Sequence, residues 1–154
     1  MPDLNLDAYL PYRLSVASNK VSALIAKAYE ARFGLSVPQW RLLVILSQTA
    51  ALSQKDIVLR SAMDKVTISR AVAALLARGL LVRTNKAYDR RVDVLSLSEA
   101  GRTIVADVTP LALGFEAALV EAIGEDQAAS LSNMLATLEA RADALAHDAR
   151  SDRS

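Results

Sequence analysis

The sequence contains no cysteine, and its other scarce residues also exclude several kinds of protein. Without cysteine, the chain has no disulfide, thiol nucleophile, iron–sulfur cluster or cysteine-based redox sensor. The single histidine, His147, is too little for a zinc site, so we expect no metal and no cofactor. No uninterrupted apolar run reaches the about 18 residues of a membrane span, and residues 1–13 lack the pattern of a secretory signal. These absences predict a cytoplasmic protein.

The charges that are present are unevenly distributed. The 154 residues are 53% hydrophobic, which is enough for one domain with a core, and the net charge is only +1. Residues 53–98, however, carry nine basic and four acidic side chains, whereas residues 99–154 carry four basic and ten acidic ones. The basic middle segment therefore favours a polyanion as the partner.

Apolar residues recur at steps of three and four in both terminal parts of the chain. This spacing predicts a helix from Asp7 to Arg32 and two helices after Ser98 that are separated near Gly124. A further helix should begin at a capping box formed by Ser36 and Gln39. One small domain cannot bury the terminal stripes, so we expect two copies to bury them against each other as a homodimer.

The middle of the chain has the pattern of a helix-turn-helix followed by a hairpin. In residues 53–79, Ser53 and Asp64 are placed to cap two short helices. Residues 80–97 follow with two alternating segments, "LLVRT" and "VDVLSL", around a polar turn. The expected class is therefore mainly α (α+β), a winged helix-turn-helix domain with flanking dimerisation helices.

The second helix of this motif has one face without a bulky apolar anchor. On a helical wheel, Ile68, Val72 and Leu75 point one way, and the opposite side carries small and polar residues. Such a face suits a DNA groove, because Arg70 can bond guanine, hydroxyls can bond phosphates or base edges, and a valine can contact a thymine methyl. The candidate DNA contacts on this helix are Lys65, Val66, Thr67, Ser69 and Arg70.

The segment "LSQKDIVLRSAMDKVTISRAVAALLARGLLVRTNKAYDRRVDVLSLSEAG" resembles the DNA-binding core of the MarR family of transcriptional regulators. Its wing carries the family's D-x-R, at Asp89 and Arg91, followed by L-[ST]-x-x-G, at residues 97–101. The sequence departs from the family between the two helices, where Ser61 and Ala62 replace an apolar residue and glycine. Alanine is costly if that position requires a positive φ.

The resemblance implies a role for the wing tip. Arg91 would enter the DNA minor groove, and Asp89 would hold its guanidinium by a charge-assisted hydrogen bond. Lys86 and Arg90 would reach phosphates.

The resemblance also implies a domain organisation and a ligand. Residues 1–35 and 98–150 would form the dimerisation region, and residues 36–97 the DNA-binding domain, on a pseudo-palindromic operator in double-stranded DNA. Members of the family often bind small aromatic acids between these parts, which predicts a repressor that a ligand releases. The candidate ligand contacts are Tyr12, Arg13, Trp40 and Arg41.

Two other classes remain open from the residues alone. A small enzyme is the less favoured one, because the sequence has no glycine-rich phosphate loop, metal-ligand cluster or nucleophile–base pair. A winged helix can also serve as a protein-interaction module without specific DNA binding. The exposed face of the second helix separates the two uses, because interaction modules expose aromatic or leucine side chains there.

Overall fold

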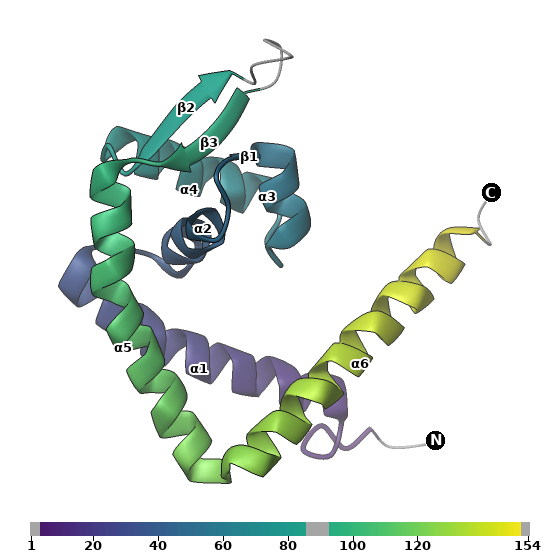
Figure 1. Ribbon diagram of the computed structural model, residues 1–154. Helices are drawn as coiled ribbons and strands as arrows, with labels where there is room; N and C mark the ends of the chain where they lie inside the picture. The colour runs from purple at the N-terminus through teal and green to yellow at the C-terminus, as the bar shows by residue number, and fades with distance from the viewer. Residues whose placement is uncertain (1–3, 86–92, 152–154) are drawn as a thin grey trace. The chain divides into compact units, whose positions relative to one another are not determined.

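The computed structural model (Figure 1) describes residues 4–85 and 93–151. It divides into two compact units, one ending at Ala112 and the other beginning at Leu113. The first unit contains α1 (Leu10–Phe33), α2 (Val37–Ser47), β1 (Leu52–Ser53), α3 (Gln54–Arg60), α4 (Lys65–Ala77), β2 (Leu81–Asn85), β3 (Asp93–Leu97) and the first part of α5 (Glu99–Ile123). The second unit contains the rest of α5 and α6 (Glu125–Ser151). The expected class, mainly α with a winged helix-turn-helix, is confirmed.

The three strands form one antiparallel sheet in the order β1-β3-β2. The β2–β3 hairpin is the expected wing, and its register pairs Leu81 with Leu97 and Asn85 with Asp93. The short strand β1, which was not expected, pairs Leu52 with Leu95 on the other side of β3. The wing is thus joined to the start of α3 through backbone pairing.

Helix α2 forms the centre of the first unit. It packs against α1, α3, α4 and β3, and it buries Leu42, Leu43 and Leu46 almost completely. The other fully buried side chains come from the elements around it: Tyr29, Leu35, Ile57, Ile68, Val72, Leu75 and Leu95. This core holds the apolar face of α4 and leaves the opposite face of the helix exposed.

The helix ends follow the capping residues of the sequence. Gly34 ends α1 with a left-handed φ of 60° and donates its N–H to Glu30 O. The Ser36 N–H donates to Gln39 Oε1 at 2.9 Å, as the expected capping box requires. Helix α1 begins at Leu10 rather than Asp7, because Asn5 Oδ1 accepts the Asp7 N–H in a turn and Pro11 suits only the first helical turn.

The turn between α3 and α4 does not need glycine. No non-glycine residue among the described positions has a positive φ, so Ala62 pays no such strain. Ser61 is buried there, and its N–H donates to Ile57 O at 2.9 Å. The departure from the family pattern is therefore accommodated without a left-handed residue.

Helix α5 combines length with an apolar composition. By these two criteria alone it could cross a membrane, and 6% of its most apolar stretch is buried. This is weak evidence, because helices that pack in soluble proteins meet the same criteria. Asp107, Pro110 and Glu116 also lie within this helix.

Candidate nucleic-acid interface

Helix α4 is held by a cap at its start and by an apolar face along its length. Asp64 accepts the Thr67 N–H at 2.8 Å, and the Thr67 hydroxyl donates to the other carboxylate oxygen at 2.7 Å. These hydrogen bonds lower the pKa of Asp64 below its ordinary value, because they stabilise the charged carboxylate. The buried side of the helix is formed by Ile68, Ala71, Val72 and Leu75.

The opposite side of α4 is open and polar. Val66 is 58% exposed, and Ser69, Arg70 and Ala73 are exposed as well. Thr67 is half-buried, and its hydroxyl proton is used in the bond to Asp64. The Thr67 hydroxyl oxygen can therefore accept a hydrogen bond from a base amino group. The hydroxyl has no second proton to donate to a phosphate.

A second cationic residue, which sequence reasoning did not single out, lies next to Lys65. A cavity of about 460 Å³ between the starts of α3 and α4 is lined by Gln54, Lys55, Val58 and Lys65. Both lysines are exposed. Two ammonium groups at one cavity suit the phosphates of a nucleic-acid backbone, so Lys55 joins the candidate contacts. The signal available in the sequence was its position in the first turn of a helix-turn-helix.

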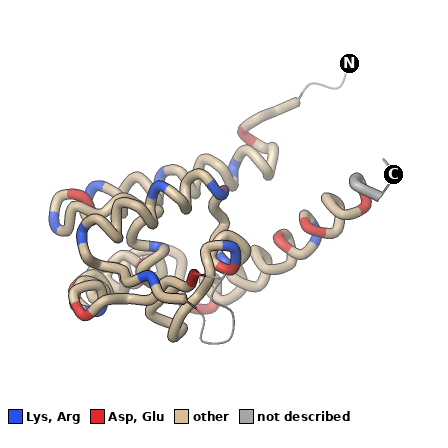
Figure 2. The backbone as a smooth tube through the Cα atoms, turned by 90° about the horizontal axis from the view of Figure 1, so that it is seen from above, with Lys and Arg blue, Asp and Glu red and all other residues tan. Residues whose placement is uncertain are grey.

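The first unit has a net positive charge, whereas α6 has a net negative charge. Figure 2 shows lysine and arginine distributed over the helices of the first unit, whereas α6 carries mainly aspartate and glutamate.

On β2 of the wing, Arg83 pairs with Asp93 of β3 at 3.3 Å, with both side chains about half exposed. Such a surface pair contributes little stability. The candidate wing-tip residues Lys86, Asp89, Arg90 and Arg91 lie outside the described residues.

Ser98 and Gly101 connect the end of α4 with the start of α5. The Ser98 hydroxyl donates to Gly79 O at 2.7 Å and accepts the Gly101 N–H at 2.9 Å. The Ser98 N–H donates to Leu80 O at 3.1 Å. A Cβ on Gly101 would lie 2.1 Å from that same carbonyl oxygen, so only glycine permits this approach. The L-S-x-x-G motif thus has a structural role, because it attaches the start of α5 to the backbone that follows α4.

Arg78 was counted among the basic residues of the middle segment, but the structure gives it an internal partner. Its Nη1 donates to Gly34 O at 2.8 Å and its Nη2 to Phe33 O at 2.9 Å. These carbonyls belong to the end of α1, 44 and 45 residues earlier in the chain. Nothing in the local sequence around Arg78 pointed to this contact.

The candidate ligand contacts are not brought together within one chain. Tyr12 and Arg13 are exposed near the start of α1, whereas Trp40 packs edge-on against Tyr29 with ring centroids 5.0 Å apart. Tyr12 and Tyr29 are separated by about 25 Å along the helix at 1.5 Å per residue. Arg41, on α2, is half-buried. Tyr29 is itself buried, which raises the pKa of its hydroxyl.

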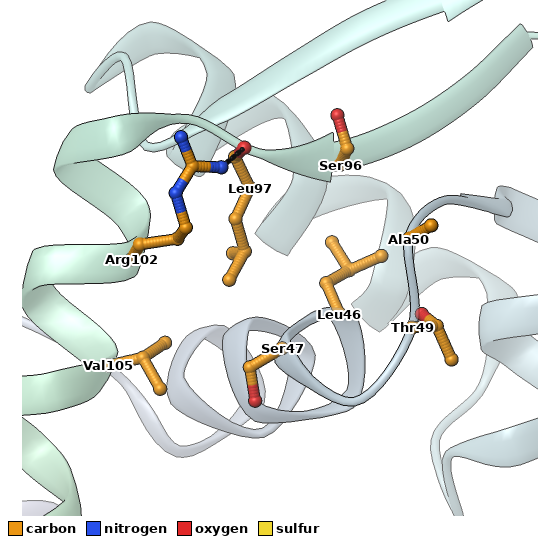
Figure 3. A pocket seen from close by; sticks show the side chains of 8 residues that line it. All are labelled: Leu46, Ser47, Thr49, Ala50, Ser96, Leu97, Arg102 and Val105. Carbon is orange, nitrogen blue, oxygen red and sulfur yellow. Dashed lines mark hydrogen bonds between the residues drawn. The ribbon is translucent and has the colours of Figure 1, made fainter.

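A different cavity in the first unit combines apolar walls with an arginine. It measures about 350 Å³ and lies between the end of α2, the end of β3 and the start of α5 (Figure 3). Arg102 Nη1 donates to Leu97 O at 3.0 Å, which holds the guanidinium at the cavity wall. Thr49 Oγ1 is buried without a partner among the described residues. The lining residues are Leu46, Ser47, Thr49, Ala50, Ser96, Leu97, Arg102 and Val105.

Comparison with known proteins gives consistent similarities. A sequence model described as MarR family matches residues 33–92. The curated protein YdgJ of Bacillus subtilis, an uncharacterized HTH-type transcriptional regulator, is 28% identical over 82 residues, which are 53% of this chain. That alignment spans 50% of the length of YdgJ.

Solved structures match along nearly their whole length. The MarR family transcriptional regulator SPO1453 from Silicibacter pomeroyi is 32% identical, with a TM-score of 0.75, over 88% of this chain and 96% of that one. The transcriptional repressor CouR, solved on a 23-mer DNA duplex, is 30% identical, with a TM-score of 0.80, over 90% of this chain and 99% of that one.

Proposed function

The chain belongs to the MarR family, and on this premise we propose that it is a cytoplasmic, sequence-specific DNA-binding regulator that acts as a repressor. The family and fold are those of transcription regulators rather than enzymes. The observation that carries the proposal is the exposed face of α4, where Val66, Ser69 and Arg70 are free to enter a major groove. CouR, a similar repressor, was solved on a DNA duplex.

The alternative of a protein-interaction module is less well supported. An interaction surface of this kind is expected to centre on aromatic or other large anchors. The exposed face of α4 offers one valine beside a serine, an arginine and alanines. The lysines at the starts of α3 and α4 add charge of the sign that DNA requires.

The active form is proposed to be a homodimer on a pseudo-palindromic operator. Residues 1–35 and 98–150 would form the dimerisation region, and residues 36–97 would bind DNA. Large apolar side chains are exposed along α1, α5 and α6, and a second copy would cover them. On α1 these include Leu10, Tyr12, Leu14 and Leu24, and on α5 and α6 Leu113, Leu119, Leu131, Met134 and Leu138.

Selection of bound sequences from random duplex DNA tests the proposed function. We expect enrichment of two inverted half-sites about 10 base pairs apart, because two symmetry-related α4 helices must enter successive major grooves on one face of the DNA. Light scattering should give twice the chain mass of 16.5 kDa. A stable monomer at micromolar concentration, or no enriched sequence, would count against the proposal.

The effector is proposed to be a small aromatic carboxylate held in the cavity beside Arg102. The cavity is of the size that suits small ligands, about 300 Å³ upward, and it offers Leu46, Leu97 and Val105 to an apolar body. The guanidinium of Arg102 offers further N–H donors to a carboxylate. This location takes the place of the cluster of Tyr12, Arg13, Trp40 and Arg41 as the first site to test.

We expect saturating salicylate-like acids to weaken operator affinity by roughly 5–150-fold, the usual range of allosteric coupling. Arg102→Gln should remove this response and leave ligand-free DNA binding unchanged, as measured by fluorescence anisotropy. Arg13→Ala is the matched control and should respond like the wild type. If Arg13→Ala loses the response and Arg102→Gln keeps it, the ligand binds near α1 instead.

A further inference from the structure

We propose that Arg78 is a positioning residue that sets the angle of α4, and hence the placement of its DNA-reading face, by tying the end of α4 to the end of α1. This inference rests on the proposed function, because it concerns how α4 is presented to DNA. Arg78 follows the last residue of α4, and its side chain is the only hydrogen-bonding link that the described residues show between α4's C-terminal end and α1.

The geometry of this contact is that of a clamp. The two terminal nitrogens of one guanidinium bond two successive carbonyls, Gly34 O at 2.8 Å and Phe33 O at 2.9 Å. A planar fork on two acceptors fixes direction as well as distance, which a single ammonium cannot do. The acceptors are carbonyls at the C-terminal end of α1, where the partial negative charge of a helix attracts a cation. Gly34, at φ 60°, ends the helix at this point.

A second fastening acts on the same end of α4. Ser98, at the start of α5, bonds Gly79 O and Leu80 O directly after α4. The end of α4 is therefore attached to α1 by Arg78 and to α5 by Ser98. At its other end, the cap is local, because Asp64 bonds Thr67 through its carboxylate and Ile68 through its carbonyl oxygen, both within the first turn of α4. The buried face of α4 holds the helix on the core, and the hydrogen bonds at its C-terminal end then fix the angle of the helix on that core.

Arg78 lies far along the helix from the residues that are expected to contact bases, so a small tilt of α4 at Arg78 becomes a larger displacement of those residues. Thr67 and Arg78 are eleven residues apart, which is about 16 Å along a helix. A tilt of about 10° at Arg78 would displace the reading end by about 3 Å. Hydrogen bonds to base edges tolerate a range of only about 0.5 Å, so this tilt is enough to lose them. Phosphate contacts by flexible lysines would survive it.

The test compares Arg78→Ala with Arg78→Lys and the wild type on the selected duplex and on a scrambled duplex. We expect Arg78→Ala to reduce the ratio of specific to non-specific affinity at least about 10-fold. The non-specific affinity and its salt dependence should stay within about twofold, because the guanidinium is engaged with carbonyls and neutralises no phosphate. Arg78→Lys keeps one ammonium and should recover part of the ratio.

A distance measurement separates positioning from loss of a DNA contact. The chain has no cysteine, so Ala73→Cys, on the exposed side of α4, gives one spin-label site per protomer. In the DNA-free dimer, Arg78→Ala should shift or broaden the distance between the two labels by several ångström. Arg70→Ala, which removes a cation from the same helix, should leave that distance unchanged.

Each outcome bears on the clamp. If Arg78→Ala retains both the label distance and the specificity ratio, the inference is wrong. If it lowers all DNA affinities together and reduces the salt slope by about one, Arg78 is a phosphate contact. If Arg78→Ala fails to fold, Arg78→Lys takes its place in the distance measurement. A label distance that is shifted or broadened relative to the wild type supports the clamp, and an unchanged distance contradicts it. If the wild type has no sequence preference, the proposed function fails, while the label distance still tests the clamp.

Discussion

Replacing Gly101 by alanine is expected to lower the free energy of unfolding by about 3 kcal/mol, the upper part of the usual range for overpacking. The added Cβ would lie 2.1 Å from Leu80 O and 3.4 Å from a methyl carbon of Leu97. The oxygen belongs to the backbone that follows α4 and accepts the Ser98 N–H, so it cannot move without loosening that hydrogen bond. The change should therefore also weaken the attachment of α5 to the end of α4.

Gly114 provides the matched control, because it lies in the same helix and, beyond its chain neighbours and its own helix backbone, no atom of the described residues lies within 4 Å of an added Cβ. Alanine at an unobstructed helical position stabilises by up to about 1 kcal/mol relative to glycine. Urea unfolding of the two variants at one protein concentration measures both effects. Equal effects of the two substitutions would show that the close approach at Gly101 is not what requires glycine there.

Replacing Arg70 by alanine is expected to remove much of the sequence preference. A bidentate contact to guanine contributes about 1–3 kcal/mol of discrimination, which corresponds to roughly 5–150-fold. Arg70 is exposed on the side of α4 opposite Ile68, Val72 and Leu75, so the fold should not depend on it. Non-specific DNA should be bound almost as well as by the wild type, apart from the loss of one charge.

Lys65→Ala is the companion variant for this measurement. Lys65 borders the cavity between the starts of α3 and α4, where a phosphate is the expected partner. Its loss should weaken all duplexes alike and reduce the slope of log affinity against log salt by about one unit. If Arg70→Ala behaves in the same way as Lys65→Ala, Arg70 contacts the backbone and reads no base.

The parts of the fold that the sequence predicted are those that depend on local chemistry. Ser53 accepts the Asp56 N–H and Asp64 accepts the Thr67 N–H, because a capping residue and its partner are three residues apart. The two faces of α4 also followed from helical periodicity, with Ile68, Val72 and Leu75 buried as expected. Such features need no knowledge of the rest of the chain.

The features that were missed depend on distant partners. Strand β1 is two residues long and exists because Leu52 pairs with Leu95, so it has no periodicity of its own. Arg78 binds carbonyls more than 40 residues away, and the sequence does not distinguish it from a solvent-exposed cation. Within one chain the length of α1 keeps Tyr12 and Trp40 apart, and the ligand contacts stay predictions. The wing-tip contacts stay predictions.

The most direct test of the central claim, that a dimer reads DNA through two α4 helices, is its affinity for altered forms of the selected operator. One form has a single half-site scrambled, and another has 5 base pairs inserted between intact half-sites, which turns them to opposite faces of the duplex. We predict that each form binds the dimer at least about 10-fold more weakly than the intact operator at the same salt concentration. Equal binding of all three duplexes would contradict the claim.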